Sequence, residues 1–208
     1  MLLLGAAFLD SRYRIVTSEY ELVYDDLPAA FDGFRIVQIS DLHGMEFGSG
    51  NSKLLDKVRK AAPDIIVITG DLVDSERQED FARMFLRGLV GIAPAYYVTG
   101  NNEWALDNVR ELLDIIEGTG VMVLRNEYTL IEINGSSIAL CGLDDPNGPA
   151  DMKKPAEVMS DLRSAEGGIF TVILSHRNKS PGYYYPLGAQ LVLSGHAHGG
   201  LIRLPFID

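Results

Sequence analysis

The chain has 208 residues, of which 47% are hydrophobic, so it is long and apolar enough to form a globular domain with its own core. Its formal net charge of −11 would repel phosphate backbones, which argues against a large nucleic-acid-binding surface. The single cysteine, Cys141, excludes an intrachain disulfide and follows an apolar run, which is typical of a small buried side chain.

We interpret residues 1–208 as one domain in which residues 1–18 form an N-terminal extension. Residues 2–9 are apolar but too few to cross a bilayer alone, and they lack the basic start of a signal peptide. They form either the end of a longer membrane segment or the first buried segment of the domain, so membrane-associated and cytoplasmic locations both stay open. Residues 19–24 alternate between polar and apolar side chains, which predicts a half-exposed strand.

Five short runs rich in β-branched or aromatic residues predict buried strands. They are residues 34–40, 64–69, 95–99, 169–174 and 190–194. Each run ends near a Ser, Thr or Gly that is followed by a residue able to bind a metal. Because sites in open α/β sheets form beyond the C-terminal ends of the strands, we expect these residues to meet at one edge. The small residues would let the backbone turn sharply there.

Apolar residues at helical spacing predict helices over residues 51–62, 76–90 and 107–117. Asn51 or Ser52 would cap the first helix, which Pro63 would end. The side chains expected to face the core are Leu54, Leu55, Val58, Ala62, Phe81, Met84, Phe85, Leu89, Val109, Leu112, Leu113 and Ile116. This alternation of strands and helices is typical of βαβ units with a parallel sheet.

The later part of the chain predicts a second sheet. Residues 121–124, 128–133 and 137–140 are closely spaced strand candidates, and Asn134-Gly135 would join the last two as a tight hairpin. A loop rich in glycine and proline covers residues 144–155, and a short helix over 156–164 precedes the strand that leads to His176. The loop is long enough to border a site.

All four histidines lie where a metal site would need them, directly after predicted strands: His43, His176, His196 and His198. Neutral imidazole is the commonest side-chain metal ligand. His196 and His198 share one face of an extended segment, which favours a joint ligand role. Alternative roles remain, because Asp41, Asp71 or Asn101 could serve a cap or turn and His176 could be a hydrogen-bonded core residue.

Taken together, five motifs resemble those of the calcineurin-like metallophosphoesterases across about residues 34–204. The motifs are Asp41-x-His43, Gly70-Asp71, Gly100-Asn101-Asn102-Glu103, His176 and Gly195-His196-x-His198. This resemblance implies an α/β fold with a two-sheet β-sandwich flanked by helices, in four αββα layers. Residues 33–43 are similar to the opening of the bacterial membrane-associated branch, some of whose members are thought to act on lipid-linked or sugar-nucleotide phosphates.

The resemblance also implies two metal ions that share one carboxylate. By position, Asp41, His43, Asp71 and His198 would hold one ion, and Asp71, Asn101, His176 and His196 would hold the other. This mixture of oxygen and imidazole ligands suits Mn, Fe or Zn. A hydroxide between the two ions would attack phosphorus, so we expect a phosphohydrolase that cleaves phosphodiester or pyrophosphate bonds.

One position departs from the family pattern. The family usually has His where this chain has Asn102, and that His is taken to protonate the leaving group or stabilise the transition state. Asn102 can donate a hydrogen bond but cannot deliver a proton. Either the substrate has a good leaving group, or another acid such as Glu103 takes the role, or the protein is a catalytically weakened scaffold that binds metal and protein partners. We favour the hydrolase because every expected ligand is present.

Three further expectations concern neighbours of the site. Asp74 could pair with a site residue or be a solvated surface acid, and Arg177 could contact a substrate phosphate or form a surface ion pair. Residues 199–208 begin as another strand would, so the sheet edge there would need further chain or a partner chain to cover it. The substrate would be a phosphorylated small molecule or a lipid-linked phosphate.

Overall fold

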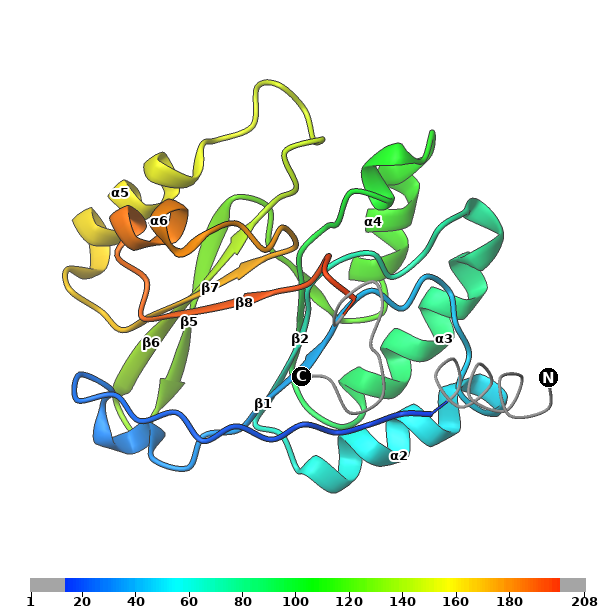
Figure 1. Cartoon of the computed structure of the whole chain (residues 1–208), viewed down its shortest axis with the longest axis horizontal. Coiled ribbons are helices and arrows are strands. Elements are labelled where there is room, and N and C mark those ends of the chain that lie inside the picture. Colours follow the sequence, from blue (N-terminus) through cyan, green and yellow to red (C-terminus); the bar gives the residue numbers. More distant parts are fainter. Residues whose placement is uncertain (1–13, 199–208) are drawn as a thin grey trace, which may run out of the picture.

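The computed structural model describes residues 14–198, which form two four-stranded sheets packed face to face (Figure 1). In the first sheet all strands are parallel, in the order β1 (Ile36–Ile39), β2 (Ile65–Ile68), β3 (Ala95–Tyr97) and β4 (Met122–Val123). The second sheet has the order β5 (Glu127–Ile133), β6 (Ser136–Leu143), β7 (Thr171–Ser175) and β8 (Leu191–Ser194). In it, β5 and β6 are antiparallel, whereas β6, β7 and β8 are parallel.

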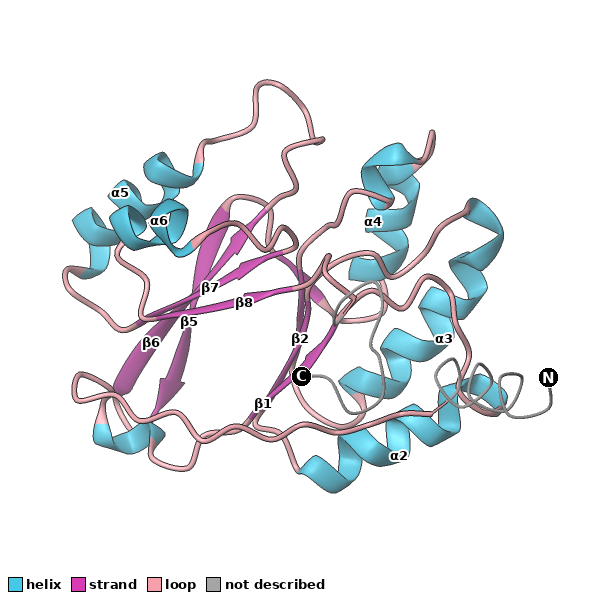
Figure 2. Cartoon of the chain, viewed as in Figure 1, coloured by secondary structure: helices cyan, strands magenta, loops and turns pink. Residues whose placement is uncertain are grey.

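Helices cover the outer face of each sheet (Figure 2). The first sheet carries α2 (Ser52–Ala61), α3 (Glu79–Val90) and α4 (Val109–Glu117). The second carries α5 (Pro155–Glu166) and α6 (Pro181–Tyr184). Short 3-10 helices occur at Ala29–Phe31, Ser49–Asn51, Glu76–Gln78, Glu103–Ala105 and Tyr185–Leu187. Since parallel strands need long crossovers, the helices link successive strands and bury the outer faces of both sheets.

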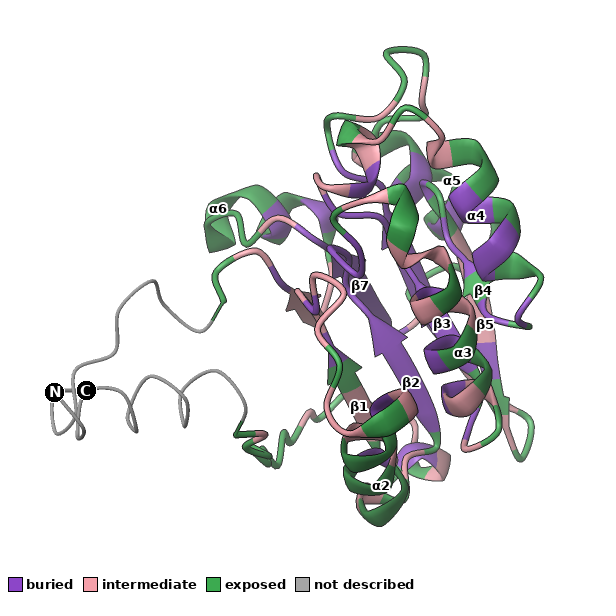
Figure 3. Ribbon diagram, turned by 90° about the vertical axis from the view of Figure 1, so that its right-hand side faces the viewer, coloured by how far each residue is buried: buried purple, intermediate pink, exposed green. Residues whose placement is uncertain are grey.

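The alternation of side chains along each strand explains the four layers. In β2, Ile66 and Ile68 pack against the helices of the first sheet, whereas Ile65 and Val67 face the second sheet. In β6, Leu140 lies between the sheets and its neighbours face α5. Three apolar layers therefore separate the helices and the two sheets, and the most buried strands are β2, β3, β6 and β7 (Figure 3). The predicted αββα architecture is confirmed.

The predicted hairpin is also present. Ile133 pairs with Ser136 in the antiparallel register of β5 and β6. Asn134 and Gly135 between them both have positive φ, at 50° and 78°. This is the backbone that a two-residue turn of matching twist requires, and Asn-Gly adopts it most readily.

Four predictions were wrong in detail. Ala62 does not face the core, because α2 ends at Ala61 and Ala62 is an exposed C-cap residue with a positive φ of 48°. Residues 19–24 form no strand, because no neighbouring strand offers them backbone partners within residues 14–198. Met84 is 60% exposed, because the buried face of α3 is formed by Ala82, Phe85 and Leu86 instead. Asn51 precedes α2 but does not cap it, since its Oδ1 accepts a hydrogen bond from the Phe47 N–H at 2.8 Å.

Some expectations lie outside the described range. The apolar residues 2–9 and the strand expected after residue 198 belong to residues 1–13 and 199–208, which the structure does not describe. Between residues 14 and 198, none of the helices combines the length and the apolar character needed to cross a membrane. Residues 14–24 form an N-terminal arm without regular secondary structure. Its exposed apolar side chains are Val16, Tyr20, Leu22 and Val23.

Candidate metal centre

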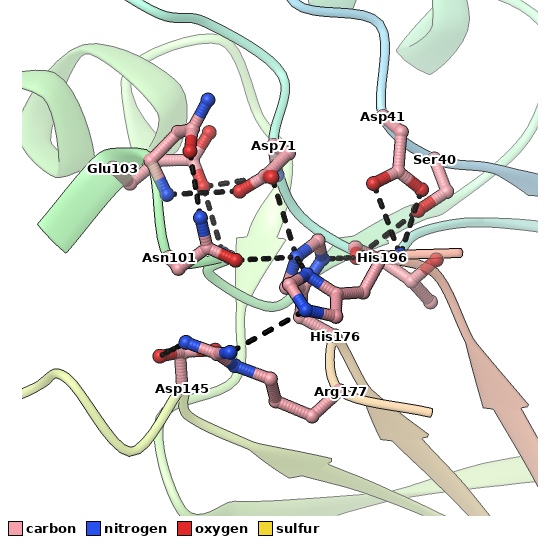
Figure 4. A network of polar contacts seen from close by, with 12 residues as sticks. Ser40, Asp41, Asp71, Asn101, Glu103, Asp145, His176, Arg177 and His196 are labelled. Carbon is pink, nitrogen blue, oxygen red and sulfur yellow. Dashed lines mark hydrogen bonds and ion pairs between the residues drawn. The ribbon is translucent and has the colours of Figure 1, made fainter. Parts of the chain in front are cut away.

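The C-terminal ends of β1, β2, β3, β7 and β8 bring all seven candidate ligands together (Figure 4 shows most of them). Two groups form, each with its ligand atoms within 4.8 Å of one another. The outer group is Asp41, His43 and His198, and the inner group is Asp71, His176 and His196. The arrangement follows from the parallel order of the strands, whose ends converge where the two sheets meet.

The backbone at this edge is unusual. Five of the seven candidate ligands have positive φ, between 50° and 69°, and they are Asp41, His43, Asp71, His196 and His198. Non-glycine residues seldom adopt this conformation, and clusters of it mark functional sites. Hydrogen bonds between loops hold it in place, because the N–H of Asp41 donates to the Gly70 carbonyl and that of His43 to the Asp71 carbonyl, each at 3.0 Å.

Two glycines permit the close approach of the loops. A Cβ at Gly100 would collide with the carboxylate and backbone nitrogen of Asp71. A Cβ at Gly195 would collide with the side chains of Ser40 and Asp41. Both positions therefore require glycine, which fits the sequence-based expectation that small residues precede the ligands.

His176 lies at the centre of the inner group and is fully buried. Its Nδ1 lies 2.8 Å from the Thr69 carbonyl oxygen, which only accepts, so Nδ1 carries the proton of the neutral ring. Its Nε2 faces three electron-rich atoms: Asp71 Oδ2 at 3.3 Å, Asn101 Oδ1 at 3.2 Å and His196 Nδ1 at 3.1 Å. Four lone pairs thus converge on one buried point, which is the donor arrangement that a cation fits.

Asp71 and His176 both have shifted pKa values in this buried group. Burial raises the pKa of Asp71, but hydrogen bonds from His176 and the Asn102 N–H outweigh it, so the pKa is lowered overall. Burial lowers the pKa of His176, but its contacts with the Asp71 carboxylate and the Thr69 carbonyl leave it raised overall.

The outer group is more open. His43 Nε2 lies 3.2 Å from His198 Nε2, and His198 Nε2 lies 3.5 Å from Asp41 Oδ1. Asp71 Oδ2 lies 4.0 Å from His43 Nε2 and 3.3 Å from His176 Nε2, so one carboxylate oxygen is near both groups. This placement agrees with a carboxylate shared by two ions, while the ligand role of each residue stays a prediction.

Glu103 has a different environment from that expected of a catalytic acid. Its side chain is fully buried, and one carboxylate oxygen accepts the N–H groups of Asp71 at 3.0 Å and Gly100 at 2.7 Å. The other oxygen accepts the N–H of Leu72 at 2.7 Å and, at 3.4 Å, that of Val73. Burial raises the pKa of Glu103. This geometry favours a positioning role, in which Glu103 holds the loops that carry Asp71 and Asn101.

Asn102 and Asp74 border the outer group. Asn102 Nδ2 donates to Asp74 Oδ1 at 2.6 Å and lies 3.2 Å from His43 Nδ1. Asp74 Oδ1 also lies 2.6 Å from His43 Nδ1, so Asp74 pairs with a site residue, one of the two readings left open by the sequence. A carboxylate on the remote nitrogen of an imidazole orients the ring for metal binding.

Sequence reasoning missed Asp145. Its buried carboxylate accepts from Arg177 Nε at 2.7 Å and from Nη2 at 3.3 Å, and the guanidinium lies beside His196 (Figure 4). A signal was present, because Asp144-Asp145 follows a buried strand as Asp41 and Asp71 do. The sequence pattern at these two aspartates predicts only the start of a loop.

Comparison with known proteins gives one family. The model of the family described as calcineurin-like phosphoesterase matches residues 34–200. The chain is 29% identical to the uncharacterized metallophosphoesterase YkuE of Bacillus subtilis over 201 residues, which cover 93% of this chain and 68% of that protein. It is 32% identical to the uncharacterized protein YpbG of Bacillus subtilis over 174 residues, covering 79% of this chain and 61% of that protein. The chain thus spans roughly two thirds of the length of these relatives.

Among solved structures, TT1561 of Thermus thermophilus is similar to the chain, with a TM-score of 0.55 and 19% sequence identity. The match covers 77% of this chain and 81% of that one. At this identity the similarity concerns the fold, and it agrees with the two-sheet architecture described above.

Proposed function

The chain belongs to the calcineurin-like phosphoesterase family of metal-dependent hydrolases, and from that premise we propose that it cleaves a phosphodiester or pyrophosphate bond with the help of two metal ions. The observation that carries this proposal is the buried convergence on His176 Nε2 of Asp71 Oδ2, Asn101 Oδ1 and His196 Nδ1, at 3.3, 3.2 and 3.1 Å. A structural role alone would not require four acceptors at one buried point.

The donor set supports a transition metal. Imidazole nitrogens mixed with carboxylate and amide oxygens favour Mn, Fe or Zn over Ca or Mg. Asp41, His43 and His198 would hold one ion, Asn101, His176 and His196 the other, and Asp71 would contact both. Two ions bound there would lower the pKa of a water molecule and offset charge on the phosphate.

The chain's own residues prepare this site before substrate arrives. Glu103 fixes the two loops that carry Asp71 and Asn101, and Thr69 sets the tautomer of His176. Asp74 orients His43 from the outside. Asn102 can donate a hydrogen bond to a leaving-group oxygen but supplies no proton, so the best substrates would carry leaving groups that depart as stable anions.

Asn102 also supports a second candidate function. Without the usual histidine, the protein could be a catalytically weakened scaffold that binds metal and a protein partner. The two functions differ in turnover, because a hydrolase needs the metal ligands for catalysis and a scaffold needs them only for folding.

One experiment separates these functions. Elemental analysis of the purified protein is combined with hydrolysis assays on a monoester, an activated aryl phosphodiester and a pyrophosphate diester. We expect about two transition-metal ions per chain and manganese-stimulated cleavage of the diester or the pyrophosphate that His176→Ala abolishes. Two bound ions with background turnover on all three substrates would favour the scaffold.

We also propose a phosphorylated small molecule or a lipid-linked phosphate as substrate, with no large nucleic-acid surface. The exposed apolar side chains of the N-terminal arm, Val16, Tyr20, Leu22 and Val23, support association with a membrane. Sedimentation with lipid vesicles tests this, and replacement of Val16 and Val23 by Ser should reduce the bound fraction. Equal binding of the wild type and this variant would contradict a role of the arm.

A partner chain at the free edge of β8 is a further proposal. β8 is the last strand of its sheet within residues 14–198, and an uncovered edge offers unpaired backbone groups. Light scattering of the purified protein tests it, since a monomer at all concentrations would contradict pairing between copies.

A further inference from the structure

We propose that Arg177 and Lys179 form an anion-binding subsite beside the metal centre, which selects substrates that carry a second phosphate next to the one that is cleaved. The inference rests on the proposed hydrolase function, because it assigns a substrate class to the same site. Its basis is the direction in which the free donors of Arg177 point, together with a small hollow that both cations line.

Arg177 is held so that one edge of its guanidinium stays free. Asp145 accepts from Nε and Nη2, which occupies the side edge of the group. The end edge, formed by Nη1 and the second hydrogen of Nη2, has no carboxylate partner within residues 14–198. A planar fork of this kind binds two phosphate oxygens at once.

The free edge faces the metal centre. Arg177 Nη1 lies 3.4 Å from His196 Nε2, while His196 Nδ1 points toward His176. If His196 binds a cation through Nδ1, the proton of its neutral ring lies on Nε2, which then cannot accept a hydrogen bond from Arg177. The donors of Nη1 would then be available to a phosphate oxygen at the site.

Asp145 acts as a positioning residue for Arg177. Its carboxylate is fully buried and meets two guanidinium nitrogens, so the pair is far less screened by water than a surface ion pair. The hydrogen bond and charge of Asp145 raise the pKa of Arg177, in keeping with a permanently charged group. A long flexible side chain is thus fixed in one orientation before any substrate binds.

A hollow of about 190 Å³ opens beside Arg177. Lys179 and Tyr183 line one part of it, and Met152 and Pro155 line another. Pockets for drug-sized ligands measure about 300–1,000 Å³, so this hollow fits a smaller group such as a phosphate with a few carbon atoms. Because Arg177 lines this hollow, the hollow would bind the chemical group that is attached to the phosphate at the metal centre.

The charge in the hollow favours an anion, although the chain carries a net charge of −11. Two carboxylates are near, but Asp145 is paired with Arg177 and Asp144 with Arg125 at 3.1 Å. Lys179 makes no ion pair in the described part of the chain, and its Nζ lies 4.4 Å from the centre of the Tyr183 ring. Lys179 therefore remains an uncompensated cation for a second phosphate.

The test compares two small ligands that differ by one phosphoryl group, dimethyl phosphate and dimethyl methylenediphosphonate, a non-hydrolysable analogue of dimethyl pyrophosphate, by calorimetry on the metal-containing protein. Calorimetric affinity is a readout independent of turnover. We expect the pyrophosphate analogue to bind about two- to fivefold more tightly, the upper part of the range for one added exposed charge pair. Lys179→Gln should bring the ratio of the two affinities close to one, whereas Lys60→Gln, an exposed lysine on α2, should leave it unchanged.

Arg177 and Asp145 give the second half of the test. Arg177→Gln should weaken both ligands, and Asp145→Asn should weaken them less, because the guanidinium remains but is no longer fixed. If Arg177→Gln does not fold because it leaves the buried Asp145 carboxylate without its charged partner, the exposed Lys179→Gln variant still decides. Equal affinities in the wild type, or an unchanged ratio in Lys179→Gln, would overturn the subsite.

The outcomes also separate this inference from the proposed function. Cleavage of an aryl phosphodiester without any preference for the pyrophosphate analogue would leave the hydrolase standing and remove the subsite. A preference that depends on Lys179, in a protein that hydrolyses nothing, would keep the subsite and remove the hydrolase.

Discussion

The two candidate ligand groups differ in how the chain holds them. In the inner group, Asp71 is 2% exposed and His176 is fully buried, and backbone carbonyl and N–H groups fix both. In the outer group, the side chains of His43 and His198 are 22% and 48% exposed, and side chains such as Asp74 fix them. Backbone contacts within the core orient a ligand permanently, whereas exposed side chains must be ordered on binding. The inner group should therefore bind its ion more tightly.

The largest effect should come from breaking the inner group. His176→Ala removes the atom on which the inner ligands converge, so hydrolysis should fall to background and one tightly bound ion should be lost. The matched variant His198→Ala should lose the weaker ion, and an excess of manganese should restore part of its activity. Turnover and metal content are measured together for both. Equal loss in both variants, unaffected by added metal, would break the distinction between the groups.

The second largest effect should come from Glu103, which holds the backbone of the loops that carry the inner ligands. Glu103→Gln places an amide nitrogen against two of the four N–H groups that the carboxylate now accepts. Each buried donor left unsatisfied costs about 1–3 kcal/mol, so the free energy of unfolding should fall by roughly 2–6 kcal/mol. Urea denaturation measures this, with Glu117→Gln on the exposed face of α4 as the control. A change within the error of the control would show that Glu103 does not hold the loops.

A smaller effect is expected from the support of the outer group. Asp74→Asn removes the carboxylate that orients His43, and loss of such a partner typically weakens metal affinity by about 10–100-fold. The affinity of the second ion to bind, measured by titration, should fall while that of the first stays the same. Asp56→Asn, which removes an exposed ion pair on α2, serves as the control. Weakening of the first ion alone would reverse the assignment of the two groups.

The smallest effect should come from Asn102. Asn102→Ala should reduce turnover less than about tenfold, because a neutral donor contributes less than a proton-delivering acid. Asn102→His should instead increase cleavage of substrates with poor alkoxide leaving groups, since the position borders Asp74 and His43. Rates on paired aryl and alkyl esters test both variants. A loss in Asn102→Ala as complete as in His176→Ala would show that the proton is not dispensable.

The sequence predicted the buried strands and the meeting of the candidate ligands because these depend on local patterns, whereas the four layers were implied by the family resemblance. Buried strands have continuous apolar runs, and the residue after each run lies at a known edge of the sheet. The alternation of polar and apolar residues over 19–24 led to a wrong strand prediction, because a strand also needs a neighbouring strand that no local pattern reveals.

The supporting contacts could not be predicted, because they join residues far apart in the chain. Glu103 follows Asn102 in the sequence, yet its carboxylate turns to the backbone of Asp71 and Leu72. Asp145 and Arg177 are 32 residues apart and meet only because β6 and β7 are neighbours. Such contacts depend on the register of the folded sheets, which the spacing of motifs does not contain.

The most direct test of the account is a crystal structure of the manganese-loaded protein with anomalous scattering recorded at a wavelength sensitive to manganese. The account predicts two peaks on either side of the Asp71 carboxylate, one near His176 and His196 and the other near His43 and His198, with the first at higher occupancy. A well-ordered site with no peak beside Asp71 would contradict it.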